Sequence, residues 1–233
     1  MKKYLLSIDW DYFIYTKKEN WGSYIESNRN IINLWYKRYF QFKEQGKDFK
    51  KAFLLSAGVN TFWKELNKHF VFKSDAHIYV SDSHALAYDV AKENECDGIY
   101  LFDAHSDLGY GGLESLEFEV NCANWLGKLF KDKYINEADI IYSPFTIESP
   151  DDFKEISNAY NVNFMSINNI KKNTEISELH ICRSGAWTPP WLDSKFLKFI
   201  KEAKLPYKVI DCSMRKWQPD GLTLGERIYY LMA

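Results

Sequence analysis

Short apolar runs alternate with longer segments of helical periodicity along this chain. Apolar runs bounded by polar or turn residues are typical of buried strands. They predict strands at Tyr4–Ile8, Ala52–Ser56, His77–Ser81, Gly98–Phe102, Ile140–Tyr142, Asn163–Ile167, Leu179–Cys182 and Tyr207–Ile210. Apolar spacings of three and four, together with capping residues such as Ser149, predict helices. These helices cover Ile25–Gln45, Thr61–Lys68, His84–Glu93, Ala123–Lys131, Asp151–Tyr160, Pro190–Ala203 and Leu222–Leu231.

This alternation of strands and helices predicts a three-layer α/β fold, with a mostly parallel sheet covered by helices on both faces. The chain has 233 residues and contains no repeat, linker or low-complexity tract, so we expect a single domain over residues 1–233. A chain of this length can bury a sizeable core without disulfides.

Composition and charge exclude several classes of protein. The chain is 46% hydrophobic and 27% charged, which excludes a disordered protein. Its net charge of −2 argues against a nucleic-acid partner bound by a basic surface. No apolar run approaches the roughly 18 residues of a membrane span, and Asp9 comes too early for a secretory signal. We therefore expect a cytoplasmic protein without a membrane partner.

The cysteines and the aromatic residues are the other unusual features of the composition. Cys96, Cys122, Cys182 and Cys212 lack the spacing of zinc-binding pairs, so we expect reduced thiols that take no part in a metal site. Aromatic residues make up 17% of the chain. This excess indicates either an aromatic-lined surface or groove, or only a compositional bias.

Three predicted strands run directly into carboxylate and imidazole side chains. These segments are Asp9-Trp10-Asp11, Ser81-Asp82-Ser83-His84 and Asp103-Ala104-His105-Ser106-Asp107. The carboxyl ends of parallel strands form the ligand crevice of an open α/β sheet. Because residues two apart in extended chain point to the same side, each segment can direct several ligands into one pocket.

Converging carboxylates repel one another unless a cation compensates them. Oxygen ligands with one or two imidazoles suit Mn²⁺ or Mg²⁺, and this many ligands suggest two ions that share a bridging water. Each segment alone has another explanation. Asp9-Trp10-Asp11 can be a polar turn, Ser81 and Asp82 can cap a helix, and His84 can be a structural histidine.

The same segments resemble signatures of the arginase/agmatinase (ureohydrolase) family. LFDAHSD at 101–107 resembles its DAHxD motif, SIDWD at 7–11 resembles its SxDxD motif, and SDSH at 81–84 resembles its Gly-Gly-Asp-His segment. The resemblance implies two Mn²⁺ ions held by Asp9, Asp11, His84, Asp103, His105 and Asp107. It also implies a catalytic role for Asp107, as the bridging residue that transfers the proton, and for His105.

Two departures from the family pattern refine the resemblance. In arginases SxDxD follows DAHxD, whereas here it precedes it, which implies a circularly permuted connectivity. SDSH also lacks both glycines. The combination of SIDWDYF, DAHSDLGY and NCANWLG more closely resembles the divergent group that includes peptide arginases. It implies hydrolysis of an arginine side chain in a ribosomally made precursor peptide, which yields ornithine and urea.

The substrate-binding residues are less clearly marked. Asn121 and Asn124 can either hydrogen-bond substrate or cap a helix. The acid that holds the guanidinium group is nominated among Glu117, Glu119 and Asp211. The segment from Arg183 to Trp191 is either a rigid loop with Trp191 in the core or an aromatic rim that includes Trp187. The aromatic residues in or beside the motifs are Trp10, Tyr12, Phe13, Tyr110 and Trp125.

Three other functions are compatible with these residues. The first is hydrolysis of a small guanidine compound by the same two manganese ions. The second is a metal-dependent deacetylase, a group that resembles the same fold but usually has one zinc ion and tandem histidines that this chain lacks. The third is a non-catalytic peptide-binding module, although an inactive site would have no reason to retain six costly ligands.

Overall fold

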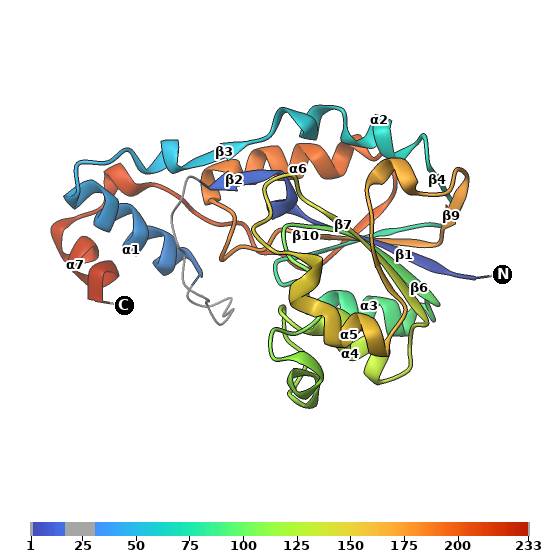
Figure 1. Ribbon diagram of the computed structural model, residues 1–233. Helices are drawn as coiled ribbons and strands as arrows, with labels where there is room; N and C mark the ends of the chain where they lie inside the picture. The colour runs from blue at the N-terminus through green and yellow to red at the C-terminus, as the bar shows by residue number, and fades with distance from the viewer. Residues whose placement is uncertain (1, 17–30, 233) are drawn as a thin grey trace.

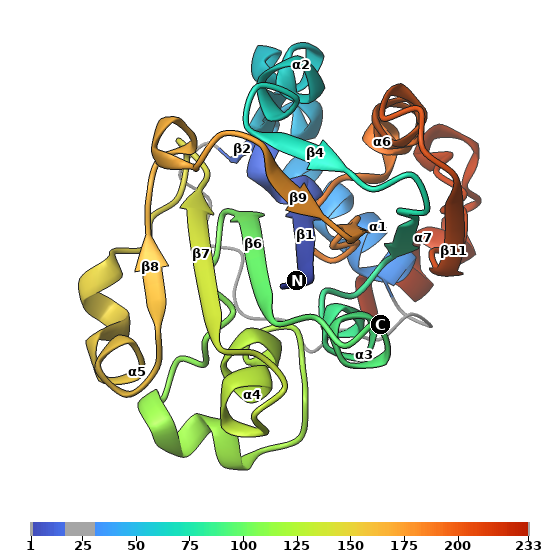
Figure 2. The same ribbon diagram turned by 90° about the vertical axis from the view of Figure 1, so that its right-hand side faces the viewer.

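The computed structural model describes residues 2–16 and 31–232 (Figure 1). Its centre is a seven-stranded, all-parallel sheet with the order β11-β5-β10-β1-β6-β7-β8. The strands are β1 (Tyr4–Asp9), β5 (Ile78–Ser81), β6 (Gly98–Asp103), β7 (Glu137–Tyr142), β8 (Val162–Phe164), β10 (Glu178–Cys182) and β11 (Tyr207–Asp211). Figure 2 shows β8, β7, β6 and β1 side by side.

Helices cover both faces of this sheet. The helices on its faces are α2 (Phe62–Leu66), α3 (Leu86–Glu93), α4 (Trp125–Lys131), α5 (Lys154–Ala159) and α6 (Asp193–Glu202), whereas α1 (Ile31–Glu44) and α7 (Leu224–Met232) pack on each other beyond the sheet. Figure 1 places α2 and α6 on one side and α3, α4 and α5 on the other. Alternate residues of β1 face the two helical layers. Leu6 and Ile8 belong to the core cluster with α6, while Leu5 belongs to the core cluster with α3. The predicted three-layer α/β fold is confirmed.

Four short strands lie outside the central sheet. They are β2 (Ile14–Thr16) paired antiparallel with β3 (Phe53–Leu55), and β4 (Phe70–Phe72) paired parallel with β9 (Thr174–Ile176). The strand predicted at Ala52–Ser56 is therefore present as β3 but takes no part in the central sheet. The sequence did not predict the other three.

Most predicted boundaries are close to those observed. The strand predicted to end at Ile167 ends at Phe164. The described part of the first helix is Ile31–Glu44, and residues 25–30 of that prediction lie outside the described residues. The predicted cap is confirmed, because Ser149 and Asp152 form a capping box. Among the described residues, no disulfide joins the four cysteines, and no helix is both long and apolar enough to cross a membrane.

The aromatic residues beside the motifs have different positions. Trp10 and Phe13 lie in the core beneath α6, so these two rings line neither a surface nor a groove. Tyr12 packs against Phe62 and Phe102, at ring-centroid distances of 5.7 Å each. Much of the aromatic excess therefore fills the core rather than a surface.

Candidate metal centre

The three acidic segments meet at the carboxyl ends of adjacent strands. Asp9 ends β1 and Asp103 ends β6, and the two strands pair in register with Ile8 opposite Phe102. Asp11 lies in the single 3-10 turn that follows β1, where its backbone N–H donates to Asp9 Oδ1 at 2.9 Å. His84 lies in the turn between β5 and α3. Parallel pairing thus brings together side chains that are far apart in the sequence.

The first group of ligands surrounds His84. Its Nδ1 lies 2.9 Å from Asp107 Oδ2, 3.0 Å from Asp103 Oδ2 and 3.2 Å from Asp9 Oδ2. All four side chains are buried. Three carboxylate oxygens therefore converge on one imidazole nitrogen in a region that excludes water.

The second group surrounds His105. Its Nδ1 lies 3.1 Å from Asp11 Oδ2 and 3.6 Å from Asp103 Oδ1. The His105 side chain is 35% exposed, so this group is the more accessible one. Asp103 contributes one oxygen to each group and is the carboxylate that they share. Asp107, which the resemblance implied as the bridging residue, lies beside His84 instead.

The buried carboxylates of the cluster strongly change one another's pKa values. Burial, followed by the charges of Asp11 and Asp107, raises the pKa of Asp103 well above its ordinary value. Burial and Asp11 raise the pKa of Asp9 to about 6. Burial also acts to raise the pKa of Asp11, but the adjacent His105 outweighs it and lowers that pKa.

The two histidines respond in the opposite direction. Burial acts to lower the pKa of His84 and of His105, but the neighbouring carboxylates outweigh burial and raise both well above the ordinary value. The cluster therefore attracts protons when no other cation is present. Two divalent ions would offset its four carboxylates, Asp9, Asp11, Asp103 and Asp107, without those protons.

Two buried polar atoms without hydrogen-bond partners bear on whether these residues fit metal ions. His84 Nδ1 and Asp103 Oδ2 have no hydrogen-bond partner among the described residues, although they lie only 3.0 Å apart. Unsatisfied buried polar atoms are rare in native proteins, and one explanation of them is an ion. Carboxylate oxygens with two imidazoles are a donor set for Mn²⁺ or Mg²⁺. The residues therefore fit a pair of hard divalent ions.

Asp107 is held in place by the start of α4. It has a φ of 52°, in the left-handed region that aspartate tolerates better than most residues. The Trp125 indole N–H donates to Asp107 Oδ2 at 2.6 Å, and the Leu126 backbone N–H donates to the Asp107 carbonyl at 3.1 Å. Gly127 allows this approach, because a Cβ there would lie 2.3 Å from the Leu108 carbonyl oxygen. Trp125 thus acts on the site through one hydrogen bond.

Replacing Trp125 with phenylalanine should reduce affinity for Mn²⁺ by about tenfold to a hundredfold, the usual effect of removing a hydrogen bond to a metal ligand. The aromatic ring stays, so the loss of stability should be small. Titration of free Mn²⁺ by electron paramagnetic resonance measures the affinity, and Trp63→Phe, which removes an indole bond to the Phe199 carbonyl, is the matched control. Equal affinities for the two variants would contradict this role of Trp125.

The predicted asparagines serve the loop before α4. Asn124 Oδ1 accepts from the Asn121 backbone N–H at 2.8 Å, and Asn124 Nδ2 donates to the Ser115 carbonyl at 3.2 Å. Asn121 Oδ1 accepts from the Ala123 backbone N–H at 2.9 Å. These contacts lie within the loop, and Asn124, the N-cap residue of α4, makes no side-chain cap hydrogen bond. Glu119 is exposed, and its carbonyl accepts from both asparagine side chains.

The loop that follows β10 places Trp191 toward the core and Trp187 near His105. Trp191 packs against Trp35 and Phe49, with ring centroids 5.8 and 5.3 Å apart, so it belongs to the core side of the loop. The Trp35 indole N–H donates to the Gly185 carbonyl at 2.7 Å, which stiffens the loop. Trp187 lies at the site, with its ring centroid 6.0 Å from that of His105.

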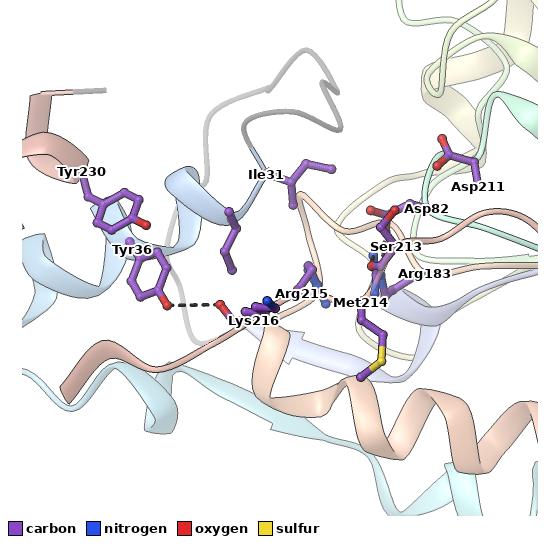
Figure 3. Close-up of a pocket in the computed structure, with 11 residues that line it drawn as sticks. Ile31, Tyr36, Asp82, Arg183, Asp211, Ser213, Met214, Arg215, Lys216 and Tyr230 are labelled. Carbon is purple, nitrogen blue, oxygen red and sulfur yellow. Dashed lines mark hydrogen bonds and ion pairs between the residues drawn. The ribbon is translucent and has the colours of Figure 1, made fainter. Parts of the chain in front are cut away.

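Asp211 lies apart from these ligands, at the end of β11. It lines a cavity of about 380 Å³ together with Asp82, Arg183, Arg215 and Lys216 (Figure 3). The polar groups in the cavity wall are largely paired with one another, since Arg183 Nε donates to Asp82 Oδ1 at 2.7 Å. Asp211 therefore contributes to this cavity rather than to the surroundings of His105.

The sequence did not predict Glu148, which lies beside His105 and Asp107. It follows β7 and interacts electrostatically with both of those residues. Its carboxylate accepts from the Ser106 backbone N–H at 2.9 Å, from the Tyr142 hydroxyl at 3.1 Å and from the Tyr110 hydroxyl. Burial raises the pKa of Glu148. No motif surrounds this glutamate. The only signal in the sequence is its position in the segment that follows a predicted strand.

Comparisons with known proteins identify no relative of this chain. No family model matches the chain, and neither a curated protein nor a solved structure matches it.

Proposed function

We propose that this protein is a hydrolase with two manganese ions that cleaves the guanidinium group of an arginine residue in a peptide, leaving ornithine and releasing urea. The observation that carries the proposal is the pair of ligand groups that share Asp103, with His84 Nδ1 buried and unsatisfied between carboxylates. The choice of substrate rests on the resemblance of the DAHSD and SIDWD segments to the ureohydrolase motifs, and the permuted connectivity is part of the same proposal.

One ion would be held by Asp9, His84, Asp103 and Asp107, and the other by Asp11, Asp103 and His105. Such a pair supplies a hydroxide nucleophile near neutral pH by lowering the pKa of water. Asp107 is oriented by Trp125 and is the residue we assign to proton transfer. Cytoplasmic location is part of the proposal, since the cysteines form no disulfide among the described residues.

Glu148 is the acid that we assign to the guanidinium group. Arginine stays cationic at any working pH, so a carboxylate beside the metal ligands both attracts and orients it. The three donors to Glu148 occupy two acceptor sites on Oε2 and one on Oε1, which leaves the second site of Oε1 available to a guanidinium N–H. Because Glu148 lies next to the accessible His105, substrate would enter from that side.

Two aromatic rings at the same side support a peptide substrate. Trp187 is half-buried beside His105, and Tyr110, which donates to Glu148, is 57% exposed. Exposed rings next to a binding acid offer surface to the chain that flanks the reacting side chain. A free small guanidine compound has no flanking chain to contact the exposed part of the Tyr110 ring.

The test is a mass assay on synthetic arginine-containing peptides, with Mn²⁺ added to metal-depleted protein and with free arginine and agmatine as parallel substrates. Conversion of arginine to ornithine in a peptide, with urea released in equal amount, is the expected result. Urea from the free compounds alone would select the small-molecule function. If the protein binds no Mn²⁺ and gains no activity from it, the hydrolase proposal fails.

Replacing Glu148 with glutamine should raise the KM for the guanidinium substrate by about tenfold to a hundredfold, because a charge-assisted hydrogen bond contributes about 1.5–3 kcal/mol. Metal content should stay the same, since Glu148 is not among the ligands. Steady-state kinetics and metal analysis measure the two effects. Glu114→Gln, at an exposed position, is the matched control. An unchanged KM would remove Glu148 from substrate binding.

A further inference from the structure

A chain of buried hydrogen bonds leads from a backbone carbonyl to His84. Ser81 Oγ donates to the Ser83 carbonyl at 2.7 Å, and Ser81 Oγ also lies 2.8 Å from His180 Nε2. His180 Nδ1 lies 3.1 Å from Ser7 Oγ, and Ser7 Oγ lies 2.8 Å from His84 Nε2. Ser7, Ser81 and His180 are each 0% exposed, so water cannot substitute for any of these partners.

The carbonyl at one end sets the direction of the whole chain. A carbonyl oxygen only accepts, so the single hydroxyl proton of Ser81 is directed to Ser83. Ser81 must then accept from His180 Nε2–H, which leaves His180 Nδ1 as an acceptor for the Ser7 hydroxyl. Ser7, having donated its only proton, accepts from His84 Nε2–H.

Parallel strand pairing holds these partners together. Ser7 of β1 is the register partner of His180 of β10, and Ser81 ends β5 on the other side of β10. The rings of His84 and His180 stack with centroids 5.5 Å apart and an interplanar angle of 23°. Ser7, Ser81 and His180 therefore lie on three adjacent strands of the sheet, next to His84.

We infer that His180 is a positioning residue that fixes the tautomer of His84, through Ser7, so that the hydrogen of the neutral ring is on Nε2 and Nδ1 is available as a metal ligand. This inference rests on the metal site proposed above. Nδ1 is the nitrogen that faces Asp9, Asp103 and Asp107. Without the chain, the neutral ring would keep its hydrogen on Nδ1, where three carboxylates accept it, and a metal ion would have to displace that tautomer.

The first experiment compares two variants of His180 by titration with Mn²⁺. In His180→Leu the Ser7 hydroxyl loses its acceptor and turns toward His84 Nε2, so affinity should fall by about tenfold to a hundredfold. In His180→Asn the side-chain carbonyl can still accept from Ser7, so most of the affinity should remain. The matched control is His69→Leu, which removes a buried histidine that contacts the Ile170 carbonyl.

The second experiment uses a double-mutant cycle and the tautomer itself. If His180 acts through Ser7, His180→Leu should cost little further affinity in a Ser7→Ala background. In the unmodified metal-free protein, ¹⁵N spectra of the histidine rings should show His180 with hydrogen on Nε2 and none on Nδ1. This measurement needs no variant, so it holds even where a substitution prevents folding.

The outcomes separate this inference from the proposed function. Failure of the wild-type protein to bind Mn²⁺ would overturn the metal site. Wild-type binding together with equal affinity for His180→Leu, or a His180 ring that carries its hydrogen on Nδ1, would overturn the role of His180 and leave the metal site standing. Independent effects of His180→Leu and Ser7→Ala would show that His180 does not act through Ser7.

Discussion

Replacing Asp103 with asparagine is expected to abolish manganese binding and hydrolysis together, and to raise the melting temperature of the metal-free protein by a few degrees. Asp103 supplies an oxygen to both ligand groups, so its loss affects both sites at once. The loss of activity should exceed the roughly hundredfold effect of removing a ligand's hydrogen-bond partner.

The gain in stability follows from the sign of the pKa shift. Burial and three neighbouring carboxylates raise the pKa of Asp103 in the folded protein, so ionisation of this carboxyl group is more costly in the folded than in the unfolded state and opposes folding above the ordinary aspartate pKa. Asparagine removes this penalty. The gain should vanish in acid, below the ordinary aspartate pKa, where the wild-type carboxyl is protonated in both the folded and the unfolded state.

Thermal unfolding with and without Mn²⁺ measures both effects. Mn²⁺ should raise the melting temperature of the wild-type protein, because a ligand that binds only the folded state stabilises it, and should leave Asp103→Asn unchanged. Asp89→Asn, on the exposed face of α3, is the matched control and should behave like the wild type. A destabilised Asp103→Asn that still responds to Mn²⁺ would contradict the shared-ligand arrangement.

Replacing Trp10 with alanine should lower the free energy of unfolding by about 3–5 kcal/mol, the usual range for a buried tryptophan. Trp10 lies between the proposed ligands Asp9 and Asp11, yet its ring is 1% exposed and its centroid lies 5.4 Å from those of Phe13 and Phe199. The expected effect is therefore on folding rather than on substrate contact.

Denaturant unfolding measures the free energies of unfolding of Trp10→Ala and Tyr110→Ala, and so compares a buried with an exposed aromatic residue. The Tyr110 ring is 57% exposed, so its loss should change stability by no more than about 1 kcal/mol. Similar losses for the two variants would show that Trp10 is not the core residue described above.

Some parts of the site depend only on local sequence. An acidic residue directly after an apolar strand is visible in SIDWD and DAHSD, and the fold of alternating strands and helices follows from periodicity. The structure brings all six predicted ligands together, in two groups around His84 and His105. Asp211, by contrast, ends a strand at the sheet edge and lies in a separate cavity.

Other parts of the site could be located only once the pairing of the strands was known. The next predicted strand after SIDWD, β3, pairs with β2, whereas the spatial neighbours of β1 are β6 and β10. This pairing makes Ser184, after β10, a hydrogen-bond donor to Asp9. It also brings Glu148 to His105 from the end of β7.

The sequence alone determined the fold class, the chain segments that supply ligands and the donor chemistry of the site, because each depends on residues that are near one another in the chain. Only the tertiary structure decided that Asp103 is the shared carboxylate, that Trp10 belongs to the core, and that Ser81, His180 and Ser7 form one chain to His84. These features depend on strand order and register, and pairing between strands far apart in the sequence leaves no local pattern.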